Sequence, residues 1–170
     1  FYNKIIIMKN DDPNIKNLNI NNIKAFIFSP GPGHPKKTGF MPKIIKKYNR
    51  MIPMLGICLG HQAIIENFGG RIKRSQEVCH GKVYKMKHFS NSPIFKNIEN
   101  HFQATRYHSL IGDKEKFPDT LKVTAVSSND QEIMAIQHKY YPIFGLQFHP
   151  ESIETVEGLK MIQNFIKEIK

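Results

Sequence analysis

Short apolar runs alternate with amphipathic stretches along the first half of the chain. Residues 4–8, 25–28 and 54–57 form short, mostly apolar runs, which are typical of buried strands. Residues 41–49 and 59–68 instead carry apolar side chains at helical spacing. Strands separated by helices predict right-handed crossover connections, and these build a mainly parallel sheet with helices on both faces.

The pattern changes after Gly81, where strand-like runs follow one another without a long helix between them. This change favours an antiparallel extension of the sheet. The runs expected to form strands are residues 82–86, 103–107, 121–127, 132–137 and 143–148.

The last segment, residues 155–169, has the spacing of a helix that docks on the sheet. Its apolar stripe is expected to contain Val156, Leu159, Ile162, Phe165, Ile166 and Ile169. Taken together, the pattern predicts one α/β domain over residues 1–170, a three-layer sandwich around a mainly parallel sheet with a small antiparallel extension.

Composition narrows the class of protein. The chain has 170 residues, 40% of them hydrophobic, which suffices for one domain with its own core. Two cysteines and the lack of a long apolar run or signal-peptide pattern argue against a disulfide framework and a membrane span. We therefore expect a reducing compartment, the cytoplasm or alternatively a plastid.

The formal net charge of +11 would ordinarily suggest nucleic-acid binding. The lysines are scattered along the chain, however, and arginine occurs at only four positions. This distribution is typical of solvated surfaces, so we do not expect a nucleic-acid partner.

Gly56-Ile57-Cys58-Leu59-Gly60 fits a nucleophile elbow, in which a sharp strand-to-helix turn exposes the middle side chain and glycines prevent clashes around it. An apolar strand precedes it and a helix is expected to follow. The N-terminus of a helix also stabilises a thiolate. Cys58 is therefore a candidate nucleophile, although a buried structural cysteine in a glycine-rich turn gives the same pattern.

A second candidate lies at the end of the expected strand over residues 143–148, where His149 and Glu151 stand two positions apart. Residues at this spacing on extended chain face the same way. Glu151 could then orient His149 as a base toward Cys58, the arrangement of a catalytic triad. A His-Pro-Glu tripeptide taken alone is more often an ordinary loop.

Three further segments are less specific. Pro30-Gly31-Pro32-Gly33 follows a strand and could be an oxyanion loop or a plain turn. His108 could serve as an alternative base. Cys79-His80 lacks the paired spacing of a zinc site, so we expect no metal and no other cofactor.

Four motifs together resemble the class I glutamine amidotransferases of the anthranilate synthase and aminodeoxychorismate synthase type, across essentially the whole chain. Three of them are the glycine-proline loop, the elbow with its extension His61-Gln62, and Phe148-His149-Pro150-Glu151-Ser152. The fourth, Arg106-Tyr107-His108-Ser109-Leu110, resembles the branch that aminates chorismate.

The resemblance implies roles for individual residues. Cys58 would attack the glutamine amide, His149 would transfer protons, and Glu151 would orient His149. The resemblance further implies that glutamine and its oxyanion are bound at Gly31, Pro32, Gly33, Leu59, Gln62, Ser109 and Leu110.

The expected function is the glutaminase subunit of anthranilate synthase, which passes ammonia to a chorismate-binding large subunit. The glutaminase of aminodeoxychorismate synthase, that of a guanylate- or carbamoyl-phosphate-forming amidotransferase, and a catalytically silent interaction module remain alternatives. The family's first strand and helix, with their Asp-Asn-x-Asp-Ser-Phe-like segment, have no match before Ile5. The resemblance therefore implies that this first strand and helix are missing.

Overall fold

The computed structural model describes residues 4–89 and 91–169. Its long helices are α1 (Met41–Tyr48), α2 (Leu59–Asn67) and α3 (Gly158–Lys167). Its strands are β1 (Phe26–Phe28), β2 (Met54–Ile57), β3 (Ile72–Arg74), β4 (Lys82–His88), β5 (His101–Arg106), β6 (Leu110–Gly112), β7 (Leu121–Ser127), β8 (Ile133–His138) and β9 (Ile143–Leu146). Short 3-10 helices are η1 (Pro13–Asn17), η2 (Ile20–Asn22), η3 (Pro35–Lys37), η4 (Pro93–Phe95) and η5 (Lys114–Lys116).

Seven strands form one sheet in the order β1-β2-β9-β8-β7-β4-β5. Strands β1, β2 and β9 run parallel to one another, and every later pair in this order is antiparallel. The α/β class is confirmed, and the antiparallel part contributes four strands to the same sheet. β2 and β9 pair in register from Met54 opposite Ile143 to Ile57 opposite Leu146, so their carboxyl ends meet at one edge.

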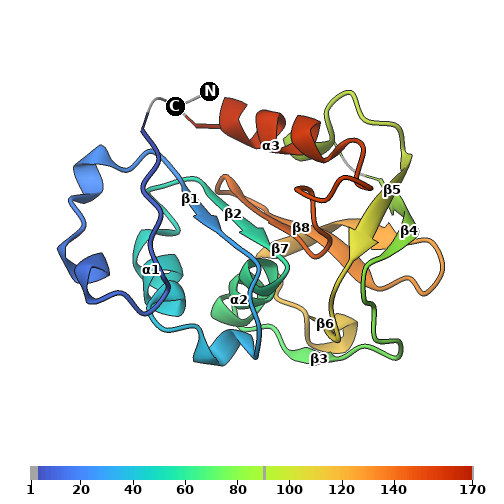
Figure 1. Ribbon diagram of the computed structural model, residues 1–170, viewed down its shortest axis with the longest axis horizontal. Coiled ribbons are helices and arrows are strands. Elements are labelled where there is room, and N and C mark those ends of the chain that lie inside the picture. The colour runs from blue at the N-terminus through green and yellow to red at the C-terminus, as the bar shows by residue number, and fades with distance from the viewer. Residues whose placement is uncertain (1–3, 90, 170) are drawn as a thin grey trace.

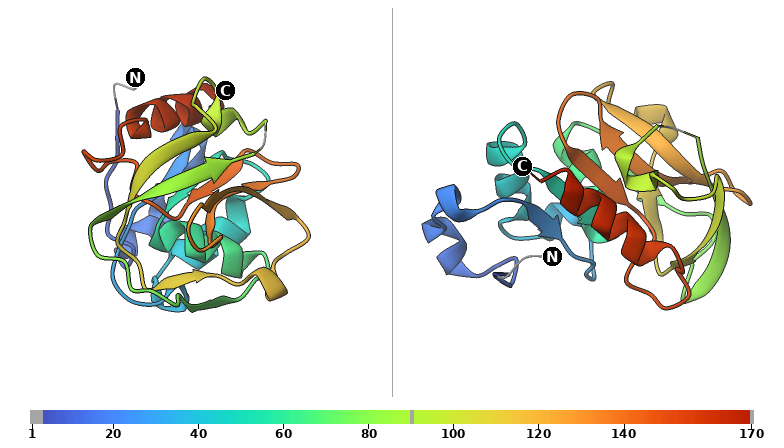
Figure 2. Two further views of the ribbon diagram at one scale, coloured as in Figure 1. Left: turned by 90° about the vertical axis from the view of Figure 1, so that its right-hand side faces the viewer. Right: turned by 90° about the horizontal axis from the view of Figure 1, so that it is seen from above.

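Helices cover both faces of the parallel part (Figure 1), with α3 on one side and α1 and α2 on the other. The end-on and top views of Figure 2 show the same layering, with α3 lying across one face of the sheet. Two apolar cores fill the spaces between the layers. Phe165 anchors the core beneath α3, and Ile45 and Ile64 anchor the core on the opposite face. The three-layer arrangement follows directly from strands that are apolar on both sides.

Residues 4–8 form no strand, contrary to the sequence-based expectation. Ile5, Ile6 and Ile7 are 77%, 54% and 90% exposed. Among the described residues β1 pairs only with β2, and no backbone hydrogen bond is found between the run over residues 4–8 and the sheet. An apolar run without a hydrogen-bonding neighbour cannot become a strand.

The expected stripe on the last helix is correct only in its second half. Phe165 is fully buried and Ile162 packs against the same core, but Val156 and Leu159 are 82% and 63% exposed. The reason is that α3 begins at Gly158, so Val156 lies in the preceding turn. The buried face instead includes Asn164, whose amide donates to the carbonyl oxygens of Ile94 and Lys96 at 3.0 and 2.9 Å.

The sequence pattern did not predict the two-stranded sheet formed by β3 and β6. Each of these strands is three residues long, which is too short for a periodic signal. Of the described helices, none is long and apolar enough to cross a membrane.

Candidate active site

Cys58 sits at a tight elbow between β2 and α2. Its backbone has φ 50°, in the left-handed region that a residue with a side chain rarely adopts. A Cβ atom on Gly56 would approach the backbone of Gly60 to 2.4 Å, and a Cβ on Gly60 would approach the carbonyl oxygen of Phe28 to 2.2 Å. Glycine is therefore required on both sides of Cys58, for steric reasons that the sequence pattern anticipated.

His149 lies just beyond the end of β9, the parallel neighbour of β2. Its Nδ1 is 2.7 Å from Oε1 of Glu151. Its Nε2 is buried and makes no hydrogen bond of ordinary geometry within the described residues, although the thiol of Cys58 lies close enough to affect the ring. The structure thus brings Cys58, His149 and Glu151 together at one edge of the sheet.

The charge state of His149 follows from these neighbours. Burial lowers the pKa of His149, but the interactions with Cys58 and Glu151 outweigh burial and raise it to about 9. Burial also acts to raise the pKa of Glu151, but its hydrogen bond to His149 and the charge of that ring lower it overall. At neutral pH the arrangement therefore favours an imidazolium beside a carboxylate.

Cys58 and His149 both line a hollow of about 370 Å³ that opens to solvent. Pro30, Gly31 and Tyr107 complete its wall. The ring of Tyr107 meets the ring of His149 edge to face, with centroids 5.0 Å apart. The hollow is the natural entry to the thiol, because Cys58 itself is only 7% exposed.

The loop that carries His149 is tied to β5 and to α3. The backbone N–H of His149 donates to the carbonyl oxygen of Thr105 at 3.1 Å, and the Thr155 hydroxyl donates to the carbonyl oxygen of His149 at 2.8 Å. A Cβ on Gly158 would approach the carbonyl oxygen of Pro150 to 1.9 Å, so the first turn of α3 packs directly on this loop. These contacts fix the position of the His149 backbone.

The glycine-proline loop follows β1 and lies beside the elbow. A Cβ on Gly31 would approach Cδ2 of Leu59 to 3.0 Å, which places the loop against the first residue of α2. Gly33 has φ 91°, which favours glycine, while Pro32 has no N–H to offer. Since the first N–H groups of a helix lack intrahelical partners, the Leu59 N–H is available at this point.

The remaining expected glutamine-binding residues fall into two groups. Ser109 is exposed and Leu110 is partly buried, at the start of β6. Gln62 is only 3% exposed, and its Nε2 donates to the carbonyl oxygen of Leu110 at 2.9 Å and to Oε1 of Gln147 at 3.2 Å. Gln62 is therefore bonded inside the protein and is not among the residues that line the hollow.

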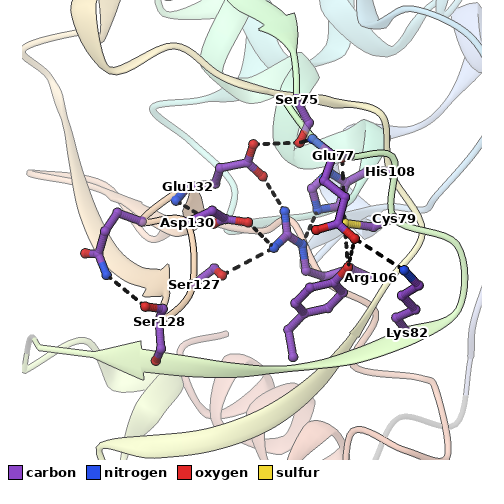
Figure 3. A network of polar contacts seen from close by, with 12 residues as sticks. Ser75, Glu77, Cys79, Lys82, Arg106, His108, Ser127, Ser128, Asp130 and Glu132 are labelled. Carbon is purple, nitrogen blue, oxygen red and sulfur yellow. Dashed lines mark hydrogen bonds and ion pairs between the residues drawn. The ribbon is translucent and has the colours of Figure 1, made fainter.

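Arg106 is completely buried at the centre of a polar network (Figure 3). Its guanidinium donates to Asp130 Oδ2 at 2.7 Å and also to Glu132 Oε2. It lies 4.5 Å from the centroid of the Tyr84 ring, a cation–π contact. The network joins the end of β5 to the turn between β7 and β8, and so holds the start of the segment that leads to Ser109.

His108 is a poor candidate for the base. Its Nε2 accepts a hydrogen bond from Nε of Arg106 at 3.0 Å. Burial, followed by the charges of Arg106 and His61, lowers the pKa of His108 to about 3. A ring that is held neutral and already accepts an internal hydrogen bond cannot readily take a proton from Cys58.

Two residues of the site were missed by sequence reasoning. Tyr107 lines the hollow, and Gln147 is fully buried with its Nε2 3.7 Å from Sγ of Cys58. Both residues lie in or beside motifs that contain a histidine. Tyr107 precedes Ser109 by two positions and Gln147 precedes His149 by two, and this position in the sequence could have indicated them as site residues. In the part of the chain that the structure describes, no three metal-ligating side chains gather into a cluster.

Comparison with known proteins places this chain in a family. Residues 2–169 match the family described as glutamine amidotransferase class-I. Anthranilate synthase component 2 of Lactococcus lactis is 42% identical over 165 residues, covering 97% of this chain and 83% of that protein. Its counterpart from Methanocaldococcus jannaschii is 47% identical over 161 residues, covering 90% of this chain and 78% of that protein.

The chain also matches part of a longer protein, the bifunctional protein TrpGD of Thermotoga maritima, with 40% identity over 163 residues. That match covers 96% of this chain but spans only 27% of the longer protein. Among solved structures, a putative GMP synthase subunit from Thermoplasma acidophilum has a TM-score of 0.81 at 24% identity, over 94% of this chain and 78% of that one. This likeness shows the fold alone. The family match over nearly the whole length shows that the chain belongs to the class I glutamine amidotransferases.

Proposed function

We propose that this chain is the glutaminase subunit of an anthranilate synthase, with Cys58 as nucleophile, His149 as proton carrier and Glu151 as the residue that orients His149. The proposal rests on one observation: Cys58 and His149 line the same hollow, and Glu151 is hydrogen-bonded to Nδ1 of the His149 ring. The names of the relatives indicate the pathway, because two relatives that this chain covers to 83% and 78% of their length are anthranilate synthase components 2.

The first step is attack of the Cys58 thiolate on the carboxamide carbon of glutamine. The carbonyl oxygen then carries negative charge, and the N–H of Leu59 and one from the Gly31 or Gly33 backbone would hold it, a contribution of about 3 kcal/mol per donor in comparable sites. Imidazolium His149 donates its proton to the departing nitrogen. The C–N bond breaks, ammonia leaves, and a γ-glutamyl thioester remains on Cys58.

The second step consumes one water molecule. Neutral His149 takes a proton from the water as the oxygen attacks the thioester carbon, and the C–S bond then breaks. Glutamate and the Cys58 thiolate are released, and His149 is again protonated. Glu151 supports both steps, since it holds the tautomer and orientation of His149 and stabilises its positive charge.

The partner follows from the fate of ammonia. In water at neutral pH ammonia is mostly ammonium, which is not a nucleophile, so the product must pass to its acceptor without full release. The designation component 2 of the relatives implies another component. We propose that this component is a chorismate-binding large subunit that receives ammonia at the open hollow.

Among the alternatives, the aminodeoxychorismate synthase glutaminase would use the same site and differ only in the partner. The relatives named anthranilate synthase component 2 favour the first assignment. A catalytically silent module differs in a testable way, because it would bind the partner without hydrolysing glutamine.

The experiment measures glutamate released from glutamine by the purified chain, alone and with an anthranilate synthase large subunit. We expect hydrolysis that the partner stimulates and that a glutamine-analogue alkylator abolishes. Cys58→Ser should abolish glutamine-dependent anthranilate formation, while synthesis from added ammonia survives.

The matched control is Cys79→Ser, which alters the other cysteine, also buried and free. This variant should retain glutamine-dependent activity. Full glutamine-dependent activity of Cys58→Ser would exclude Cys58 as the nucleophile. Demonstrated binding to the large subunit without any hydrolysis would instead identify a silent module.

A further inference from the structure

Two buried glutamine side chains connect the thiol of Cys58 to the first residue of β6. Nε2 of Gln147 donates toward Sγ of Cys58 at 3.7 Å, within reach of a hydrogen bond to sulfur. Oε1 of Gln147 accepts from Nε2 of Gln62 at 3.2 Å, and the same nitrogen donates to the carbonyl oxygen of Leu110 at 2.9 Å. The result is a continuous chain of amides beneath the hollow.

The direction of this chain is fixed by its far end. A backbone carbonyl can only accept, so the oxygen of Leu110 requires the NH₂ group of Gln62 to face it. The second N–H of that group then points at Gln147, whose side-chain oxygen must accept the hydrogen bond. The NH₂ group of Gln147 is thereby directed at Cys58. Turning the Gln147 amide over would place two donors against each other in a buried site.

The backbone around Gln147 leaves this side chain little freedom. Gln147 directly follows β9, and its N–H donates to the carbonyl oxygen of Met134 at 2.9 Å. The whole residue is buried, at 0% exposure. Water therefore does not compete for its amide, and the donor is held in place before the substrate arrives. Preorganised donors of this kind act most strongly on groups that carry charge.

We infer that Gln147 is a positioning residue for the nucleophile, which holds and stabilises the Cys58 thiolate from beneath while Gln62 fixes the direction of its amide. The inference rests on the proposed role of Cys58. It assigns different tasks to the two neighbours of the sulfur. His149 approaches from the hollow and exchanges protons, whereas Gln147 keeps its protons and offers a fixed hydrogen-bond donor.

The test measures the rate at which iodoacetamide alkylates Cys58 in the intact chain, followed by mass spectrometry of the Cys58 peptide between about pH 6 and pH 10. Gln147→Met has a similar volume and no donor. We expect its alkylation rate at pH 7 to fall by about tenfold, and its pH–rate profile to move about one unit higher, because the thiolate loses a hydrogen bond.

Steady-state hydrolysis of glutamine separates this role from a general loss of structure. In Gln147→Met we expect kcat to fall about tenfold with KM changed by less than about threefold, since the donor acts on the sulfur and not on bound glutamine. Gln62→Met should slow alkylation less than Gln147→Met does, because it leaves the Gln147 amide in place and only allows that amide to turn over. The control Gln103→Met alters an exposed glutamine on β5 and should match the wild-type rates.

Folding of each variant is checked by its thermal unfolding, and Gln147→Asn serves as a second variant if Gln147→Met does not fold. Its shortened amide cannot reach both Gln62 and the sulfur. A wild-type alkylation rate in either folded variant overturns the inference. If the variant is alkylated more slowly than wild type but wild type itself does not hydrolyse glutamine, the inference is supported and the proposed function is refuted. The two failures are therefore distinguishable.

Discussion

Replacing Arg106 by methionine tests whether the buried network of Figure 3 holds the fold together. The arginine side chain is fully buried and makes four hydrogen bonds, to His108, Ser127, Asp130 and Glu132. Methionine fills most of the space, but it supplies neither a charge nor a donor. The two carboxylates would then be left near each other without their shared counter-charge.

The magnitude follows from the burial of those carboxylates. The side chain of Glu132 is 8% exposed and that of Asp130 is 26% exposed. Breaking a buried pair by removing one partner costs about 3–5 kcal/mol, because the remaining charge stays desolvated. We expect Arg106→Met to lower the free energy of unfolding by about 4 kcal/mol at pH 7, which for a chain of this size lowers Tm by roughly 8–16 °C.

The loss should depend on pH in a defined direction. Burial acts to raise the pKa of Asp130, but the bonds and charge of Arg106 lower it overall. A carboxyl group with a depressed pKa in the folded state stabilises the fold above its unfolded value of about 3.9, and this contribution is lost as the pH falls further. The difference between wild type and Arg106→Met should therefore be largest at neutral pH and shrink below about pH 4.

The assay is urea unfolding followed by circular dichroism at several pH values. Arg74→Met is the matched control, because Arg74 is exposed on β3, and it should change stability by less than about 0.5 kcal/mol. The triple variant Arg106→Met, Asp130→Asn, Glu132→Gln should regain at least half of the loss, since no unpaired charge remains. A loss under about 1 kcal/mol for Arg106→Met alone would refute this account of the network.

Three further predictions concern the elbow, the triad and the exposed N-terminal run. Glu151→Gln removes the carboxylate that helps to raise the pKa of His149 to about 9, so the basic limb of the pH–activity profile should move down by about one unit. Protonation of His149 stabilises the fold fully below its unfolded pKa of about 6.5, and this stabilisation is lost as the pH rises through about 9. The Tm of Glu151→Gln should therefore converge on that of wild type above pH 9. Gly60→Ala forces a Cβ to 2.2 Å from the carbonyl oxygen of Phe28, and we expect at least about a hundredfold loss of glutaminase activity or a Tm more than about 10 °C lower; wild-type values of both would contradict the steric argument. Ile7→Lys, at a residue 90% exposed, should reduce self-association in light scattering without a change in Tm, whereas a marked fall in Tm would show that Ile7 is packed.

Local sequence signals were sufficient where a segment's neighbours along the chain decide its structure. The residues from Met54 to Gly60 specify strand, elbow and helix almost by themselves, because the apolar run, the two glycines and the helical spacing are all local. The contact between His149 and Glu151 is also local, but a turn brings the two side chains together, not the extended chain that the sequence suggested: the Ser152 N–H donates to the carbonyl oxygen of His149 at 3.2 Å. These local rules selected Cys58, His149 and Glu151 as candidates before any contact was known.

Tertiary structure decided whatever depends on segments far apart in sequence. The run at Ile5 to Ile7 has strand composition but makes no backbone hydrogen bond to the sheet, and it is exposed. Val156 and Leu159 have the spacing of a helical stripe, but Val156 precedes α3, and the face of α3 that is buried contains Gly158, Met161, Asn164 and Phe165, so that Leu159 stays exposed. The amide chain through Gln62 and Gln147 is decided in the same way, because hydrogen bonds between residues 85 positions apart form only when the sheet has placed β9 beside α2. Periodicity reports which side chains can be buried, while pairing and packing select the partners they meet.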